Sequence, residues 1–120
     1  MEFKYKKAKT LEERKAEYKK VIEEHPGKIG IICEKSPKSL IKDIEKTKYL
    51  IGEELTLAQF TKIIRRKLGM KQEEALFFLV NGKVSITGCD PMNEIYEKYK
   101  DKDGFLYIAY ASEEVWGSKY

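Results

Sequence analysis

The chain has 120 residues, of which 42% are hydrophobic and 37% are charged, with eight Tyr and five Phe. This length supports one hydrophobic core rather than two, and the composition excludes an intrinsically disordered chain. The formal net charge is only +4, because 24 Lys and Arg are opposed by 20 Asp and Glu, so the overall charge is weak evidence for nucleic-acid binding.

The N-terminal segment predicts an amphipathic helix over residues 10–24. Thr10 and Glu13 have the spacing of a capping box at its start. The helix should end at HPG, because Pro26 cannot donate into the last turn and Gly27 readily adopts the left-handed conformation. The basic EFKYKK before it predicts one further helical turn.

A strand is predicted at KIGIICEK, residues 28–35, with apolar side chains on both faces. Ile29, Ile31 and Cys33 share one face, whereas Ile32 lies on the other. Ile32 therefore needs a cover of its own, and the N-terminal helix is the expected one.

A second strand is predicted at KYLIG, residues 48–52. Lys48 and Leu50 share one side of it, and Tyr49 and Ile51 share the other. This strand is therefore also apolar on both faces.

The clearest helix is TLAQFTKIIRRKLG, in which Thr56 and Gln59 form a second capping box and Gly69 marks the end. ALFFLV and KVSI should then form a hairpin around Asn81 and Gly82, since Asn-Gly favours a type I′ turn.

A last helix is predicted at DPMNEIYEKY, with Asp90 as its N-cap and Pro91 at its first helical position, followed by the strand FLYIAYA. One central helix then covers a mixed sheet, which is an α+β arrangement. From the first strand onward the order is that of ubiquitin-like β-grasp domains. We divide the chain into a helical extension (1–26), a ubiquitin-like β-grasp domain (27–112) and a flexible C-terminal tail (113–120).

Several function classes lack their sequence signals. The chain contains no nucleotide-binding glycine loop, no activated nucleophile and no metal-ligand spacing, and Cys33 and Cys89 stand apart from any histidine cluster. We therefore expect no enzymatic activity, no bound metal and no cofactor. No stretch approaches the roughly 18 apolar residues of a membrane span, and the N-terminus lacks a signal-peptide core, which predicts a cytoplasmic protein.

The segments EKSPKS, IEKTKYLIGEELTLAQF, IIRRKL, EEALFFLVNG and FLYIAYASEEVWG follow one another nearly without gaps. In this order they resemble the GABARAP and light-chain-3 family of autophagy ubiquitin-like modifiers. The resemblance covers essentially the whole chain.

The resemblance implies that a cysteine protease removes the residues after Gly117. Activating and conjugating enzymes would then adenylate the Gly117 carboxylate with ATP, carry it as a thioester and join it to phosphatidylethanolamine. The protein would thereby pass from the cytoplasm to the autophagosome membrane. A glycine suits this chemistry, because without a Cβ it fits a narrow channel. Trp116 stands where Phe or Tyr is more usual.

The family also binds peptides with an aromatic-x-x-aliphatic pattern, which cargo receptors and autophagy regulators carry. The resemblance implies that the backbone of the second strand pairs with the peptide. The residues that match the aromatic pocket are Glu17, Val21, Ile32, Lys48, Leu50 and Phe105. Those that match the second pocket are Tyr49, Ile51, Leu55, Phe60 and Ile63. Lys46, Lys48 and Arg65 would attract acidic residues that flank the peptide motif.

Some of these residues have a second interpretation. Ile32, Phe60 and Phe105 would also fit an ordinary core. The resemblance implies that Phe77 and Leu79 contact the conjugation enzymes, but strand burial explains these two residues equally well. The basic N-terminus contacts membranes, tubulin or other partners in the family, but it would equally form a solvated helix face. Gly30 and Gly52 stand where relatives often have proline, which predicts softer pocket rims.

Two other functions stay open. A binding module could recruit partners to microtubules or trafficking vesicles without ever being conjugated, and the processing of Gly117 distinguishes this alternative. An RNA-binding domain would need surface aromatics between Lys and Arg on an open sheet. Most aromatics here fall on core stripes, so we expect no nucleic-acid partner.

Overall fold

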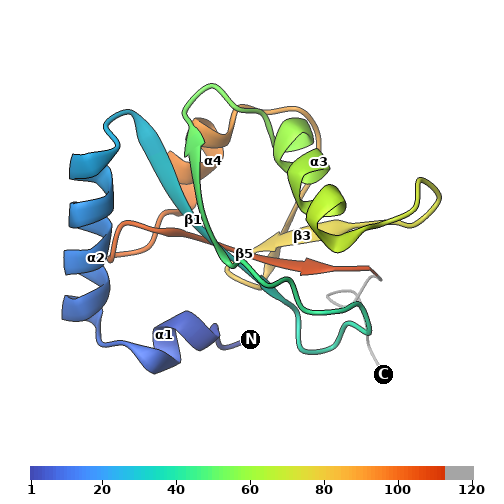
Figure 1. Cartoon of the computed structure of the whole chain (residues 1–120), viewed down its shortest axis with the longest axis horizontal. Helices are drawn as coiled ribbons and strands as arrows, with labels where there is room; N and C mark the ends of the chain where they lie inside the picture. Colours follow the sequence, from blue (N-terminus) through green and yellow to red (C-terminus); the bar gives the residue numbers. More distant parts are fainter. Residues whose placement is uncertain (113–120) are drawn as a thin grey trace.

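The computed structural model describes residues 1–112 (Figure 1). Its elements, in chain order, are α1 (Lys4–Ala8), α2 (Leu11–Glu24), β1 (Lys28–Lys35), β2 (Lys48–Gly52), α3 (Leu57–Leu68), β3 (Phe77–Val80), β4 (Val84–Ile86), α4 (Met92–Tyr99) and β5 (Leu106–Ala111). The predicted α+β fold is confirmed. The tail predicted at 113–120 lies outside the described residues.

The five strands form one mixed sheet in the order β2-β1-β5-β3-β4. β1 and β5 at its centre are parallel, and the other neighbouring pairs are antiparallel. α3 and α4 cover one face of the sheet, whereas α1 and α2 lie against the other (Figure 1). β2 and β4 are the edge strands of the described sheet.

The alternation of β1 divides its side chains between two cores. Ile29, Ile31 and Cys33 lie in the larger core with α3 and α4. Ile32 lies in a smaller core that the N-terminal segment covers. Burial strongly raises the pKa of the Cys33 thiol, and the neighbouring Glu34 adds to this effect, so Cys33 is an uncharged core side chain.

Both predicted capping boxes are present. Glu13 donates its backbone N–H to the Thr10 hydroxyl oxygen at 3.2 Å, and Thr10 donates its own to the Glu13 carboxylate at 2.8 Å. Thr56 and Gln59 make the same exchange at the start of α3. Gly69 ends α3 in the left-handed region with φ of 65°, which a glycine adopts without strain.

The prediction for the start of α4 is wrong by one residue. Pro91, not Asp90, is the N-cap, and Met92 is the first helical residue. The reason is tertiary: the Met92 backbone N–H donates to the Leu55 carbonyl at 2.7 Å, and the Asp90 carbonyl accepts from Leu57 at 2.9 Å. These bonds hold Pro91 in an extended conformation, so the helix starts after it.

The N-terminal extension is attached to the sheet largely by polar contacts. The buried Glu34 carboxylate accepts from the backbone N–H groups of Lys4 and Tyr5, at 2.7 and 3.0 Å, and so satisfies the first turn of α1. Arg14 of α2 pairs with the buried Asp103 at 2.6 Å. Phe3 adds an apolar anchor, because its buried ring packs edge-on against Tyr107.

Candidate functional site

The outer edge of β2 is the first feature of the candidate site. In the described sheet β2 pairs only with β1, in a register that places Tyr49 opposite Ile31 and Leu50 opposite Gly30. Cys33 donates its backbone N–H to the Thr47 carbonyl at 2.7 Å. Because antiparallel pairs alternate, the backbone groups of Lys48 and Leu50 should then face away from β1. The β2 edge is therefore shaped to accept another strand.

The residues predicted for the aromatic pocket come together on the face that α2 covers. Lys48 lies opposite Ile32 in the register and forms an ion pair with Glu17 of α2. Val21 and Leu50 are half-buried. Ile32 and Phe105 are both 0% exposed. The structure thus brings Glu17, Lys48, Ile32 and Phe105 together, and it covers Ile32 and Phe105.

Two tyrosines provide this cover. The ring of Tyr18 packs edge-on against Phe105 with centroids 4.9 Å apart, and the ring of Tyr5 does so at 5.5 Å. Gly30 lies against Tyr18, because a Cβ there would be 3.0 Å from both Phe105 and Tyr18. The glycine therefore permits a close approach of Tyr18. The softer rim stays a prediction.

The second predicted pocket is built on the opposite face of β2. Tyr49, Ile51 and Phe60 are buried in the larger core, and the Tyr49 and Phe60 rings meet edge-on at 6.0 Å. Leu55 and Ile63 pack against this core but are only half-buried. The accessible apolar surface at this pocket therefore comes mainly from Leu55 and Ile63.

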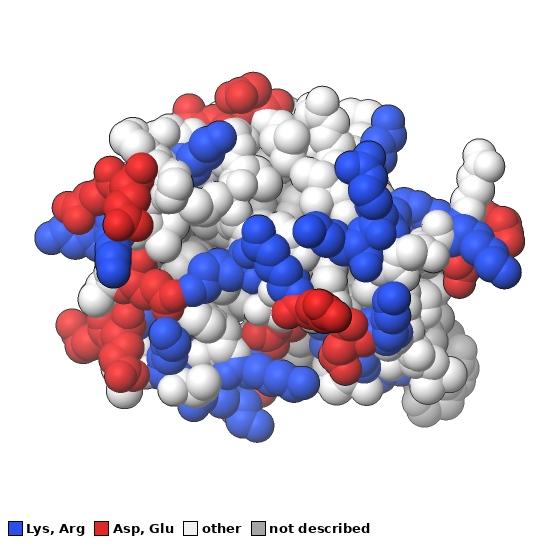
Figure 2. Space-filling view, in the orientation of Figure 1, with Lys and Arg blue, Asp and Glu red and all other residues white. Residues whose placement is uncertain are grey.

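Basic side chains gather on the face that β2 and α3 present, while acidic side chains lie toward α2 (Figure 2). The Lys46 ammonium lies 5.3 Å from the centre of the Tyr49 ring. Burial and the nearby charge of Lys9 lower the pKa of Lys48. The Arg65 guanidinium donates to the Lys71 carbonyl at 2.6 Å, so part of its donor capacity is already used. Lys46 is the better placed of the predicted cations to meet an acidic partner.

Comparison with known proteins identifies the family. Residues 13–117 match the family model described as autophagy protein Atg8, ubiquitin like. The chain belongs to this family. The crystal structure of ATG8 from Trypanosoma brucei is 38% identical, with a TM-score of 0.89, and the alignment covers 98% of this chain and 100% of that one.

Membership of the Atg8 family identifies the chain as an autophagy ubiquitin-like protein and confirms the resemblance found in the sequence. Proteins of this family are ubiquitin-like modifiers and not enzymes, and they work with the autophagy machinery and its receptors. Among residues 1–112 no group of three or more metal-ligating side chains could hold a metal ion. Nor is any helix within that range long and apolar enough to cross a membrane.

The residues predicted to contact conjugation enzymes lie on β3, which pairs with β5. Phe77 is half-buried and stands opposite Ala111 in the register of β3 and β5. Leu79 is buried and packs against Ala111. Phe77 therefore presents the more accessible surface beside the end of β5. Gly117 and Trp116 lie outside the described residues.

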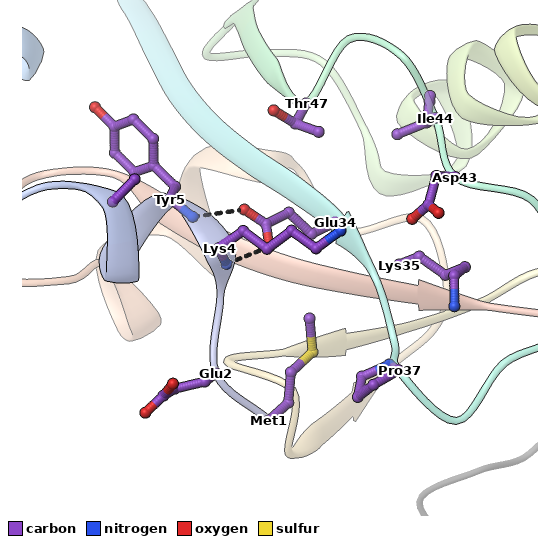
Figure 3. A pocket seen from close by; sticks show the side chains of 11 residues that line it. Met1, Glu2, Lys4, Tyr5, Glu34, Lys35, Pro37, Asp43, Ile44 and Thr47 are labelled. Carbon is purple, nitrogen blue, oxygen red and sulfur yellow. Dashed lines mark hydrogen bonds between the residues drawn. The ribbon is translucent and has the colours of Figure 1, made fainter.

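A cavity that the sequence did not indicate lies beside α1. It has a volume of about 660 Å³ and lies between Met1 and Tyr5 of the N-terminal segment and Glu34, Pro37 and Ile44 of the sheet side. Figure 3 shows Glu34 at its centre, bonded to the start of α1, with the Tyr5 ring turned away from Met1. The only hint in the sequence was that the Glu34 carboxylate falls on the same face of the strand as Ile32, where a charged group needs polar partners.

Proposed function

We propose that this Atg8-family protein is a lipid-conjugated autophagy modifier. Its chain is cut after Gly117, and the new carboxylate is joined to phosphatidylethanolamine, which brings the protein from the cytoplasm to autophagosomal membranes. Hydrolysis of the Gly117–Ser118 amide frees the carboxylate. Adenylation by ATP then releases pyrophosphate, thioester formation releases AMP, and the lipid amine displaces the enzyme's cysteine thiol.

The cysteine nucleophiles of the cleavage and thioester steps belong to partner enzymes, the final nucleophile is the lipid amine, and this chain supplies only the Gly117 carboxylate, so the protein is a substrate and not an enzyme. The match to the family model ends at Gly117, which supports this residue as the conjugated end. Phe77, half-buried beside the end of β5, gives the enzymes an accessible apolar surface, and the buried Leu79 supports the same strand.

On the membrane the protein recruits partners by binding aromatic-x-x-aliphatic peptides of cargo receptors and autophagy regulators. The observation that carries this part is the edge of β2 that no other strand of the described sheet pairs with, together with the apolar side chains on each face of the strand. A peptide added to this edge would alternate its side chains between the two faces. The aromatic residue would enter beside Leu50, and the aliphatic residue would enter beside Leu55 and Ile63.

Titration calorimetry with a Trp-x-x-Leu peptide tests the binding site. Leu50→Ala should weaken binding by at least about 1 to 2 kcal/mol, since a truncated pocket loses part of its anchor contact. Leu50 is half-buried, so the variant should fold. Val84→Ala is the matched control, because Val84 is an exposed aliphatic residue on the opposite edge strand. Equal affinities for wild type and Leu50→Ala would remove the peptide site from β2.

Acidic residues before the aromatic residue of the peptide should tighten binding, and Lys46→Ala should reduce this advantage. The gain should shrink at high salt, because exposed charges are screened. Acidic and neutral peptides that bind equally well at low salt would remove the electrostatic part of the proposal.

Processing is tested by incubation with the matching cysteine protease, followed by mass spectrometry. The expected product ends at Gly117, and only that product should become lipidated. Gly117→Ala should block the cut or the later transfer, because a methyl group restricts the backbone where the enzyme channel is narrow. Peptide binding should be unchanged in this variant. A full-length chain ending in Tyr120, recovered from membranes, would favour an adaptor that is never conjugated.

A further inference from the structure

Tyr5 of α1 lies over the aromatic pocket. Its hydroxyl donates to the Glu17 carboxylate, and its ring packs edge-on against Phe105 at 5.5 Å. The Lys48 ammonium lies 5.4 Å from the centre of the same ring. Tyr5 thus contacts three of the six residues assigned to this pocket, and it packs against the small core that contains a fourth, Ile32.

The contacts of Tyr5 are those that an incoming aromatic side chain would use. A ring that meets Phe105 edge-on beside a lysine ammonium gains both ring–ring and cation–π contact. Burial raises the pKa of Tyr5 to about 12, with Asp103 adding to this and Arg14 opposing it. The phenol is therefore a hydrogen-bond donor at neutral pH. While it stays in place, the fully covered Ile32 and Phe105 are closed to a peptide.

Of the two tyrosines that cover Phe105, Tyr18 is the more firmly held. Its hydroxyl shares a 2.6 Å hydrogen bond with the Tyr96 hydroxyl, which also donates to the Gly104 carbonyl at 2.7 Å. Its ring packs so closely on Gly104 that a Cβ there would lie 2.5 Å from it. The 14-residue helix α2 carries Tyr18, so this side chain is part of the framework.

Tyr5 is held far less tightly. α1 has five residues and none of them is buried. A helix this short is not stable by itself. It is attached by the two backbone hydrogen bonds to Glu34, the hydroxyl contact with Glu17, the ring contacts of Tyr5 and the partly exposed Lys6–Asp101 ion pair, with the buried Phe3 just before it. Tyr5 is therefore the part of the cover that can withdraw.

We propose that Tyr5 is an internal competitor that closes the aromatic pocket, and that a peptide's aromatic residue binds only when Tyr5 withdraws. This inference rests on the proposed peptide-binding function. Glu34 favours the closed state over the open one, because its hydrogen bonds hold the start of α1 in the position that places Tyr5 over the pocket. The apparent affinity for peptide is then reduced by the fraction of molecules in which the pocket is open.

The test is titration calorimetry of a Trp-x-x-Leu peptide against the full chain and its variants. Tyr5→Ala should tighten binding by about 5- to 20-fold, because it removes the competitor. Tyr5→Phe, which keeps the ring and loses only the donor to Glu17, should tighten binding by about 2- to 3-fold. Glu34→Ala should also tighten binding, although it leaves Tyr5 itself unchanged.

Tyr99→Ala is the matched control, because Tyr99 is a half-buried tyrosine that packs against the larger core on the other face of the sheet. Its affinity should equal that of wild type. Circular dichroism of each variant establishes that it is folded before its affinity is compared.

The outcomes separate this inference from the proposed function. If wild type and Tyr5→Ala bind the peptide equally, and Leu50→Ala lowers the peptide affinity in both backgrounds, the peptide site stands and the proposal that Tyr5 competes for it is wrong. If Tyr5→Ala binds more weakly, Tyr5 belongs to the binding surface and the proposal is overturned. If no variant binds the peptide, the proposed binding function fails and the competitor fails with it.

Discussion

The two faces of the sheet are covered in different ways. α3 places Leu57, Phe60, Ile64 and Leu68 in the larger core, so apolar burial fixes its position. α1 and α2 contribute no buried residue, and they are attached by ion pairs, hydrogen bonds and ring contacts. A cover held by burial is permanent on the timescale of binding, whereas a cover held by a few polar contacts can open locally.

This difference bears on the two pockets proposed for β2. The one beside α3 would be built on the main core, where burial fixes the side chains. The one beside α2 would depend on how the N-terminal extension lies. The predictions that follow perturb first the core-held face and then the polar attachments of the other.

The largest effect is expected on the face that α3 covers. Phe60 is 0% exposed and touches both Tyr49 and Phe78. Phe60→Ala should lower the free energy of unfolding by about 3 to 5 kcal/mol, because it loses burial and leaves a cavity. Urea unfolding followed by circular dichroism measures this. A loss below about 1 kcal/mol would contradict the difference between the faces.

A smaller effect is expected where α2 meets the loop before β5. Asp103 is buried and pairs with Arg14 at 2.6 Å. Arg14→Ala should cost about 2 to 3 kcal/mol, since it leaves a buried carboxylate without its cation. The loss stays below the full cost of an isolated charge, because Tyr107 and the Phe105 N–H still donate to Asp103. Unfolding at neutral pH is the measurement, with the exposed Lys15→Ala as control.

The ion pair of Lys6 and Asp101 should contribute about 1 kcal/mol or less to the free energy of unfolding, because both side chains are partly exposed. This contribution should depend on pH. Burial alone would raise the pKa of Asp101, but hydrogen bonds from Lys6 and Asp103 and the nearby positive charges lower it overall. A lowered pKa stabilises the fold above the ordinary value of 3.8, and this contribution disappears as the pH falls through the lowered pKa.

Asp101→Asn should therefore be less stable than wild type at neutral pH, and the two should converge in acid. Unfolding curves over a range of pH measure the difference. A gap that stays constant into acid would show that the charge of Asp101 is not responsible.

The smallest effect is expected at Tyr49. Its side chain is 5% exposed, and its hydroxyl is buried without a hydrogen-bond partner among the described residues. Tyr49→Phe should be neutral or stabilising by up to about 1 kcal/mol, because it removes an unsatisfied polar group and keeps the ring. A clear loss of stability in thermal unfolding would point to a partner for this hydroxyl. Tyr49→Ala, by contrast, would test core packing more than peptide binding.

Local patterns were enough to predict much of the fold. The ends of β1, β2 and α3 agree with the sequence, because alternation, capping boxes and Gly69 are all short-range signals. The start of α4 was missed, because Leu55, far away in the chain, supplies its first hydrogen bond. Local signals fail where tertiary bonds choose the boundary.

The site was predictable to a similar extent. The family resemblance named residues such as Glu17, Lys48 and Phe105 for the aromatic pocket, but it did not indicate that Tyr5 contacts all three of them. That cover joins residues 5, 17 and 105, which no local pattern connects. The buried Glu34 that anchors α1 was visible only as a carboxylate on an apolar strand face. Its role required the fold.

Amide hydrogen exchange with and without a saturating Trp-x-x-Leu peptide tests the central claim most directly. The claim is that the peptide pairs with the edge of β2 while the cover formed by α1 opens. We predict slower exchange at Leu50, whose N–H would donate to the peptide, and faster exchange at Lys4 and Tyr5, whose N–H groups leave Glu34. Unchanged exchange at Leu50, with new protection on β4 instead, would contradict the account.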